Sequence, residues 1–330
     1  MSKEFKEIKE IIFKQLKRKL FSAGIKKIDQ FKINFDLLDN EIYDSLDYMN
    51  IAVALEDKDI ELDLSLNRNR FPRSLKDFFH IAKKDLKNSN ISKKDKINLK
   101  LIFNILNVKK NDNVLVHSSF MKLANYKIDE KFFFEELQKK IGNNGTIFVK
   151  GANLKEYLLN KFSHKKTYPH QEFGILSKFI FSKKQSVRSK NPFDCLVGIG
   201  KYSNFCKKDN FCSYDDNSPW AHLAKINTKI LMVDVDFFYC SYLHRTEFQM
   251  KVPYRSIKKF KKSYGNYALY ARKKKKLYLH YNKVLDDNQI KKLTKKFTYK
   301  NINFYSISCN KLNKEVSRLL ANNKKYFLKK

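Results

Sequence analysis

The sequence predicts a small all-α bundle of about four helices, followed by a larger α/β domain. Three observations support this division of the 330 residues. Apolar residues recur at helical spacing near the N-terminus, the balance of charge reverses between residues 35 and 66, and short apolar runs alternate with helical patterns from residue 92 onward. We therefore predict a first domain at 1–83, a linker at 84–91 and a second domain at 92–330.

The first domain is predicted to begin with an amphipathic helix. Its apolar residues repeat every three or four positions: Phe5, Ile8, Ile12, Leu16 and Leu20. A long loop follows, and a second helix is predicted from about Asp44 to Glu56. Ser74 and Asp77 form a capping signal for the last helix, which would end near Ala82.

The segment between residues 35 and 66 is acidic in an otherwise basic chain, with Lys58 as its only base. It is either a solvated helix face or a surface that meets a basic partner, including the rest of the chain. Within it, Asp44 is a good N-cap and Asp47 completes the capping pattern. Ser45 would then lie exposed at the first helical position, where free N–H groups and the positive end of the helix favour an attached phosphate.

The run EIYDSLDYMNIAVALEDKDIELDL resembles the acyl carrier protein family, with Asp44-Ser45-Leu46 at the position of its attachment motif. The resemblance implies that a phosphopantetheinyl transferase attaches 4′-phosphopantetheine to Ser45 and that an acyl-loading enzyme charges its thiol. The family often has a glycine before this motif, where the chain has EIY at 41–43. The alternative is that Ser45 is an ordinary hydroxyl at a helix start.

The second domain alternates predicted strands with predicted helices, as α/β sheets do. Strands are predicted at 114–116, 146–149 and 229–235, and helices at 92–107, 131–141, 174–181 and 313–322. The tripeptide His117-Ser118-Ser119 follows the first of these strands directly. Polar residues just beyond a strand are where such folds place their ligands.

Seven segments of this region resemble, in order, segments of the aminoglycoside 3-N-acetyltransferase family. They are NDNVLVHSSF, GTIFVK, FGILSKFIF, VRSKNPFDCLVGIG, NSPW, KILMVDV and YLHRTEFQMKVPYR, and the resemblance covers about residues 92–330. It implies an α/β fold and the transfer of an acetyl group from acetyl-CoA to an amine of an amino sugar.

His244 and Glu247 are the first candidates for catalysis. Residues three apart share one face of a helix, and a histidine with a pKa near ~6.5 can take a proton from an attacking amine while a carboxylate orients it. The resemblance places the family's H-x-x-E pair on these positions; the alternative is a helix-surface ion pair. Asp194 stands where relatives often have histidine. It would anchor the acceptor ammonium, share the proton transfer, or mark a weakened activity.

Eight further residues are predicted to bind the donor or the acceptor. For coenzyme A or its pantetheine thioester, the resemblance indicates His117, Ser118, Ser119, Gly174, Arg188 and Ser189. For a cationic acceptor, Asp215 and Asp216 stand just before the matching SPW turn. The alternatives are a strand-end turn with self-satisfied hydroxyls and, for Arg188, an internal salt bridge.

The formal net charge of +35 also allows nucleic-acid binding. Most lysines alternate with acids and apolar residues, however, which indicates a compositional bias, and we expect no nucleic-acid partner. The sequence shows neither a signal-peptide pattern nor a run of about 18 apolar residues, which predicts a cytoplasmic protein without a membrane span. The five cysteines form no CxxC pair, so we predict reduced thiols and no metal site, and we disfavour an acyl-cysteine at Cys195 or Cys240.

The fusion of these two domains predicts an N-acyltransferase of surface glycan biosynthesis. It would move an acetyl or larger acyl group from the carrier domain or from acyl-CoA to an amino sugar, because a tethered carrier raises the local thioester concentration to the order of millimolar. Two alternatives stay open. One is an acetyl-CoA-dependent enzyme that modifies aminoglycoside antibiotics and has a non-functional carrier domain, and the other is a non-catalytic basic binding protein.

Overall fold

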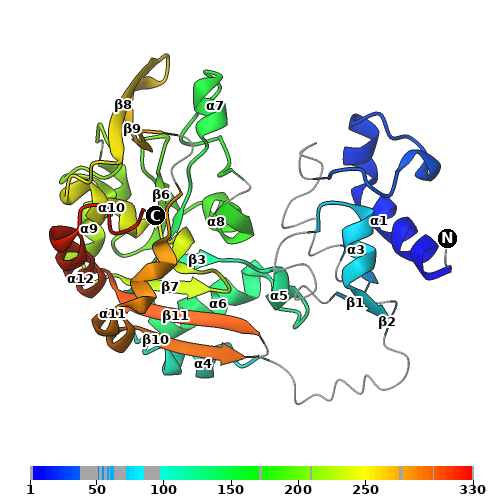
Figure 1. The fold of residues 1–330 in the computed structure, drawn as a ribbon, viewed down its shortest axis with the longest axis horizontal. Helices are drawn as coiled ribbons and strands as arrows, with labels where there is room; N and C mark the ends of the chain where they lie inside the picture. The colour runs from blue at the N-terminus through cyan, green and yellow to red at the C-terminus, as the bar shows by residue number, and fades with distance from the viewer. Residues whose placement is uncertain are drawn as a thin grey trace. The chain divides into compact units, whose positions relative to one another are not determined.

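The computed structural model describes residues 3–37, 51, 54–55, 58, 60–62, 72–84, 97–170, 173–208, 210–274, 278–299 and 301–328. The chain forms two compact units (Figure 1). The first comprises Met1–Ile97 and Phe120–Asp129, and the second comprises Asn98–Ser119 and Glu130–Lys330. Asp44 and Ser45, and with them the predicted phosphopantetheine site, lie outside the described residues, as does most of the predicted linker.

The core of the first unit forms around α1 (Lys3–Ser22). The apolar residues predicted to line this helix are at most 5% exposed, and they pack with residues that include Phe31 and Phe78. A short 3₁₀ helix, η1 (Ile28–Gln30), follows α1. α3 (Leu75–Ile81) starts as predicted, because Asp77 N donates to Ser74 Oγ at 3.3 Å and Ser74 N donates to Asp77 Oδ2 at 3.1 Å.

The prediction that the first unit is entirely helical is wrong. β1 (Ile60–Leu62) and β2 (Ala82–Lys84) form a two-stranded antiparallel sheet. Ile60 is fully buried in the core of this unit, and the pairing satisfies backbone groups of two segments that α3 does not include. The chain therefore continues beyond Ile81 as a strand, where the sequence indicated only the end of a helix.

A mixed seven-stranded sheet forms the centre of the second unit and confirms the predicted α/β architecture. Its strands, in spatial order, are β10 (Lys295–Tyr299), β11 (Ile302–Ser308), β7 (Lys229–Val233), β3 (Asn113–Ser118), β4 (Thr146–Lys150), β6 (Leu196–Gly200) and β5 (Val187–Arg188). β3 lies between β7 and β4 and pairs with both in parallel. The pairings of β10 with β11, β11 with β7, β4 with β6 and β6 with β5 are antiparallel. The central strands are apolar and almost wholly buried, as strands covered on both faces must be.

Helices cover the two faces of this sheet (Figure 1). On one face, α9 (Pro219–Lys225), α10 (Tyr242–Gln249) and α12 (Cys309–Asn322) pack against Leu115, Phe148 and Met232. Because side chains alternate along a strand, Val114 and Val116 face the other side. The helices on that side are α4 (Leu99–Ile105), α6 (Glu130–Ile141) and α8 (Gly174–Ser182).

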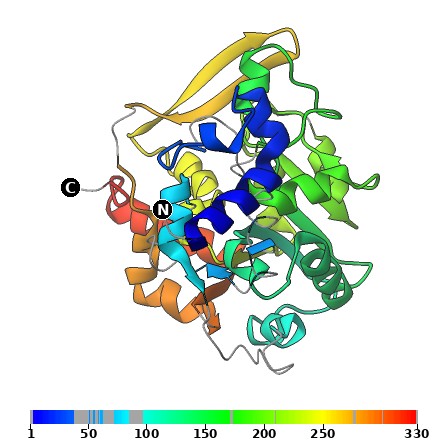
Figure 2. The same cartoon turned by 90° about the vertical axis from the view of Figure 1, so that its right-hand side faces the viewer.

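The remaining elements lie in the connections. They are α7 (Leu154–Leu158), η5 (Ser203–Lys207), η6 (Phe237–Tyr239), η7 (Tyr281–Asp286) and α11 (Asn288–Leu293). β8 (Arg255–Lys262) and β9 (Gly265–Arg272) form a separate long hairpin (Figure 2). Among the described helices, none combines the length and the apolar composition needed to cross a bilayer.

One segment of the predicted second domain belongs to the first unit. The chain leaves β3 at Ser119, forms α5 (Met121–Ala124) within the first unit and returns to the second unit with α6. Met121 is only 6% exposed and lies in the same apolar cluster as the residues of α1. The first unit is therefore completed by a segment from far along the sequence, which the predicted boundaries did not include.

Candidate active site

Four of the predicted site residues come together at one edge of the sheet. β3, β4 and β7 run parallel, so their carboxyl ends lie on the same edge. His117 lies near the end of β3, Lys150 ends β4, and α10, which carries His244 and Glu247, follows β7. β6 runs antiparallel to β4 and begins beside its end, which brings Asp194 to the same edge.

His244 and Glu247 form a hydrogen-bonded pair on α10. The distance from His244 Nδ1 to Glu247 Oε2 is 3.0 Å, and the Glu247 side chain is completely buried while that of His244 is 20% exposed. The Tyr254 and Tyr281 hydroxyls donate to Glu247 Oε1 at 2.8 Å and 2.9 Å. Arg255 Nε lies 2.7 Å from Oε2, but its N–H is not aimed at that oxygen, so this contact is an ion pair without a good hydrogen bond.

These contacts fix the ionisation of the pair. Burial alone would raise the pKa of Glu247, but its hydrogen bond with His244 and the charge of Arg255 lower it, and the carboxylate stays ionised. Nδ1 lies 3.0 Å from the carboxylate, which only accepts hydrogen bonds, and 3.1 Å from Arg255 Nη2, which only donates. The bond to the ionised carboxylate favours the tautomer with its proton on Nδ1, which leaves Nε2 a lone pair. Burial and the charge of Arg255 lower the pKa of His244, and Glu247 offsets this only in part, so the imidazole is neutral at pH 7.

Asp194 is held in a second ion pair. Lys150 Nζ lies 2.6 Å from Asp194 Oδ1 and 4.7 Å from the centre of the Phe173 ring. The backbone of Asp194 is fixed by Trp220 Nε1, which donates to its carbonyl at 2.6 Å, and by Ser213 Oγ, which accepts from its N–H at 3.2 Å. Burial would raise the pKa of Asp194, but Lys150 lowers it, so the carboxylate is ionised and already paired.

His117 is 8% exposed, and its Nε2 atom has no hydrogen-bond partner among the described residues. Burial, and then the charges of Lys150 and His244, lower the pKa of His117 to about 3. The imidazole is therefore neutral over the physiological range. A buried polar atom without a partner costs about 1–3 kcal/mol and usually marks a position that a ligand or water completes.

Ser118, Ser119 and Gly174 adjoin His117. Ser119 donates its backbone N–H to Val233 O at 2.9 Å, which uses the group that could have bound an oxyanion. Gly174 has φ +78°, and a Cβ atom there would lie 3.3 Å from the carbonyl oxygen of Ser118. Only glycine fits this approach without strain, which accounts for the residue at the start of α8.

Arg188 and Ser189 serve the interior of the protein. The Arg188 guanidinium lies between the Phe162 and Phe181 rings, 4.9 Å from each centre, and donates to the carbonyl groups of Thr167 and Gly151. Ser189 Oγ accepts from the N–H of Leu196 at 3.0 Å. This geometry favours the internal role of Arg188 over a phosphate contact, although the internal partners are carbonyl groups and not the predicted acid.

Asp215 and Asp216 hold the loop that precedes α9. Asp215 accepts the backbone N–H groups of Cys212 and Asn217 at 3.1 Å and 3.2 Å. Asp216 is paired with the buried Arg245 at 2.5 Å. Both carboxylates therefore have partners within the protein.

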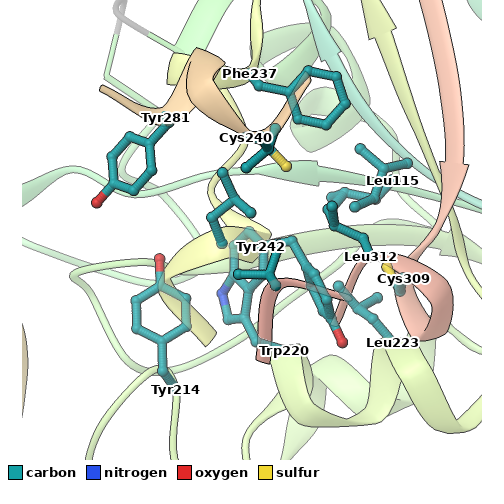
Figure 3. Packing of buried hydrophobic residues seen from close by; sticks show 14 of the residues in the cluster. Leu115, Tyr214, Trp220, Leu223, Phe237, Cys240, Tyr242, Tyr281, Cys309 and Leu312 are labelled. Carbon is teal, nitrogen blue, oxygen red and sulfur yellow. The ribbon is translucent and has the colours of Figure 1, made fainter. Parts of the chain in front are cut away.

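Five residues of the site were not among the predicted ones: Lys150, Tyr214, Tyr254, Arg255 and Tyr281. Lys150, Tyr254 and Arg255 end segments that resemble the family, whereas Tyr214 and Tyr281 lie outside all seven segments. The rings of Tyr214 and Tyr281 pack on that of His244, with centroids 5.8 Å and 5.4 Å away. Figure 3 shows these two tyrosines at one side of the apolar cluster, with Trp220 next to Tyr214. A buried carboxylate on α10 predicts that an arginine and hydroxyls surround it, but only the fold shows which ones.

All five cysteines are buried. Burial raises the pKa of each thiol, to about 11 for Cys212 and about 12 for Cys240, and the same direction holds for Cys195. A thiol must ionise to attack a thioester, so this environment agrees with the interpretation that disfavours an acyl-cysteine.

Comparisons with known proteins identify the family. The model of the aminoglycoside 3-N-acetyltransferase family matches residues 115–321. The structure of aminoglycoside acetyltransferase AAC(3)-IVa is similar with a TM-score of 0.59 and 17% identity, over 70% of this chain and 90% of that one. AAC-IIIb bound to CoASH gives 0.58 and 16% over 68% and 95%, and YokD of Bacillus subtilis gives 0.57 and 17% over 68% and 97%.

Identities this low carry the fold alone, and no curated protein matches the sequence. The family model, by contrast, covers more than half of the chain and includes every residue of this site. The chain belongs to the aminoglycoside 3-N-acetyltransferase family, and it is an N-acetyltransferase.

Proposed function

We propose that the protein transfers an acetyl group from acetyl-CoA to an amine of an amino sugar, with His244 as the general base. One observation carries this proposal: a buried, ionised Glu247 holds Nδ1–H of a partly exposed histidine whose Nε2 has no partner among the described residues. This is the arrangement that a base for a nitrogen nucleophile requires. Arg255 and the two tyrosines on Glu247 keep the pair in place.

The acceptor amine must lose protons to attack the thioester carbonyl. The charges of Arg255 and Lys150 that lower the pKa of His244 also disfavour an ammonium beside it, so a bound amine is more readily neutral. As the C–N bond forms, His244 Nε2 takes the amine proton, and Glu247 stabilises the resulting imidazolium. Collapse of the tetrahedral intermediate breaks the C–S bond, and the imidazolium returns its proton to the departing thiolate.

The residues near the dyad fit a thioester donor. His117 presents a neutral imidazole with an unpartnered Nε2, and Lys150 adds a positive charge where the carbonyl oxygen becomes negative. Acetyl-CoA supplies the activated acyl group. The solved complex of AAC-IIIb with CoASH, a structure similar to this one, supports coenzyme A as the donor.

The proposed acceptor is an amino sugar of the aminoglycoside type. A mutant of AAC(3)-IVa has been solved with a gentamicin and with apramycin, and both structures are similar to this chain. The carrier-domain route through Ser45 stays a prediction, as does the surface-glycan pathway that depends on it. Intact-mass measurement of wild type and Ser45→Ala after treatment with a phosphopantetheinyl transferase tests that route.

The proposal is tested by following thiol release from acetyl-CoA with apramycin and gentamicin as acceptors. His244→Gln should lower kcat at least about 10²-fold while leaving the protein folded, because it removes the base. His80→Gln, on the exposed side of α3, is the matched control and should be indistinguishable from wild type. Undiminished turnover in folded His244→Gln would refute the mechanism.

A further inference from the structure

Two aromatic side chains face solvent close to the catalytic pair. Phe238 is 52% exposed and Tyr239 58% exposed, and their ring centres are 5.4 Å apart at an angle of 84°. Both lie on η6, in the short connection between β7 and α10. Adjacent exposed aromatic rings leave a large apolar area in water, which commonly indicates a binding surface.

This aromatic pair is continuous with the active site. The Phe238 ring is 6.2 Å from the ring of Tyr281, and Tyr281 is 5.4 Å from the ring of His244. The Tyr281 hydroxyl also donates to Glu247. The pair follows β7, whose carboxyl end lies on the same sheet edge as His117. The Tyr281 hydroxyl lies 3.4 Å from His244 Nδ1, so this aromatic pair borders the dyad on the side of Nδ1, and a ligand with its amine at Nε2 reaches the pair by spanning the two ring contacts.

The backbone holds the two rings in a fixed position. The N–H of Phe238 donates to Asp236 Oδ1 at 2.9 Å and to Asn282 Oδ1 at 3.0 Å. Asn282 Nδ2 donates in turn to Asp236 Oδ2 at 2.8 Å, and Tyr239 N donates to Asp236 O at 3.1 Å. Two polar side chains thus tie η6 to η7, so a ligand meets a surface that is already ordered.

We propose that Phe238 and Tyr239 form the acceptor subsite, on which the C–H face of a sugar ring lies while its amine reaches His244. This rests on the proposed function, because it needs the amine at the base. A sugar ring has an apolar C–H face and a polar rim, which matches a solvent-facing aromatic surface.

Most of the carboxylates of the site are already engaged within the protein. The three acids predicted to meet a cationic acceptor already have partners: Asp194 is paired with Lys150, Asp215 caps a turn, and Asp216 is paired with Arg245. Glu247 is completely buried. Asp216 is 87% exposed as well as paired with Arg245, so uncharged contacts with the aromatic pair would add to any ionic contact that this carboxylate makes.

The test is a set of steady-state measurements on Tyr239→Ala, Phe238→Leu and Tyr239→Trp with apramycin and acetyl-CoA. In the first two variants the KM for apramycin should rise roughly tenfold, with kcat and the KM for acetyl-CoA within about twofold of wild type. Tyr239→Trp keeps an aromatic face and should retain the wild-type KM. Leu101→Ala on α4, equally exposed at 53%, is the matched control and should change neither constant.

Two outcomes overturn the inference. Unchanged constants in Tyr239→Ala would show that the rings bind nothing, and a selective rise in the KM for acetyl-CoA would assign the surface to the adenine of the donor. If wild type releases no thiol with either apramycin or gentamicin, the proposed function fails, and saturation-transfer NMR of apramycin alone still tests the subsite. A saturation-transfer signal of apramycin that is present with wild type and lost with Tyr239→Ala supports the subsite. The absence of this signal with wild type refutes the subsite.

Discussion

At the scale of single residues, the site contains two closed ion pairs around two neutral imidazoles. Glu247 with Arg255 and Asp194 with Lys150 leave little net charge, yet burial and then the nearby cations lower the pKa of both His117 and His244. The field at the site therefore opposes added positive charge. This suits a reaction whose nucleophile must be a neutral amine, and it gives the pH dependence a definite direction.

The acid limb of kcat/KM should report His244. Because protonated His244 cannot accept a proton, activity should fall as pH drops through a pKa below the ordinary value of about 6.5. Lys150→Met should move this midpoint to higher pH, since it removes a cation that lowers the pKa and leaves Asp194 unpaired nearby. Lys139→Met, which affects only an exposed pair with Glu136, should not move it. A midpoint that is unchanged or lower in Lys150→Met would contradict this account.

His117 should make the protein less stable in acid. Its pKa is about 3 in the folded protein and about 6.5 when unfolded, so below pH 6.5 the unfolded chain binds a proton that the folded protein does not. The stability that depends on neutral His117 is fully present above about pH 6.5. The free energy of unfolding should fall by about 2 kcal/mol from this cause between pH 6.5 and pH 5. Urea unfolding at both values checks it. His117→Asn should lose correspondingly less stability on acidification, and equal losses would remove His117 as the cause.

The sequence predicts some of these residues better than others. His244, Glu247, Asp194 and His117 could be chosen because each lies in a segment that resembles the family, or follows a predicted strand. Lys150 also ends such a segment, GTIFVK, but the sequence did not pair it with Asp194, because that contact forms only when β6 pairs with β4. For Arg188 the sequence left a phosphate contact and an internal role open, since its aromatic and carbonyl surroundings come from segments far apart in the sequence.

At the scale of elements, long amphipathic or apolar segments were predictable, and short or paired ones were not. α1, α6 and α12 have clear helical periodicity, and the central strands are continuous apolar runs. β6 contains two glycines, and β1 and β2 have three residues each, so their strand character depends on the partner that satisfies their backbone. The start of α8 is a further example, because its positive φ reflects the approach to β3.

Gly174→Ala should impair both stability and donor binding. A positive φ strains alanine by about 1 kcal/mol, and the added methyl group would meet the carbonyl of Ser118 at 3.3 Å, which must shift the turn beyond β3. We expect a higher KM for acetyl-CoA. Gly142→Ala is a close control, because its φ is +70° but its nearest neighbour is a flexible lysine at 3.8 Å. It should lose similar stability with an unchanged KM, and equal KM values in the two variants would exclude the proposed contact.

At the scale of the whole molecule, the two compact units are not successive domains. Residues 120–129 lie between β3 and α6 of the transferase fold, yet they belong to the first unit, where Met121 is buried with the residues of α1. The segment begins directly after the His117-Ser118-Ser119 turn. A single short stretch of chain therefore connects the core of the first unit to the turn that is predicted to bind the donor.

Removing residues 1–97 should consequently leave the transferase unit with an uncovered apolar segment, which lowers its solubility and thermal midpoint. The sign of one substitution tests this explanation. In the full chain Met121→Gln should lower the free energy of unfolding by about 2 kcal/mol, because it buries an amide. In the truncated chain residue 121 would be exposed to solvent, so the same change should improve solubility by replacing an apolar side chain with a polar one. Thermal unfolding and sedimentation of the four proteins measure both effects. An equal effect of Met121→Gln in both backgrounds would mean that Met121 does not belong to the core of the first unit.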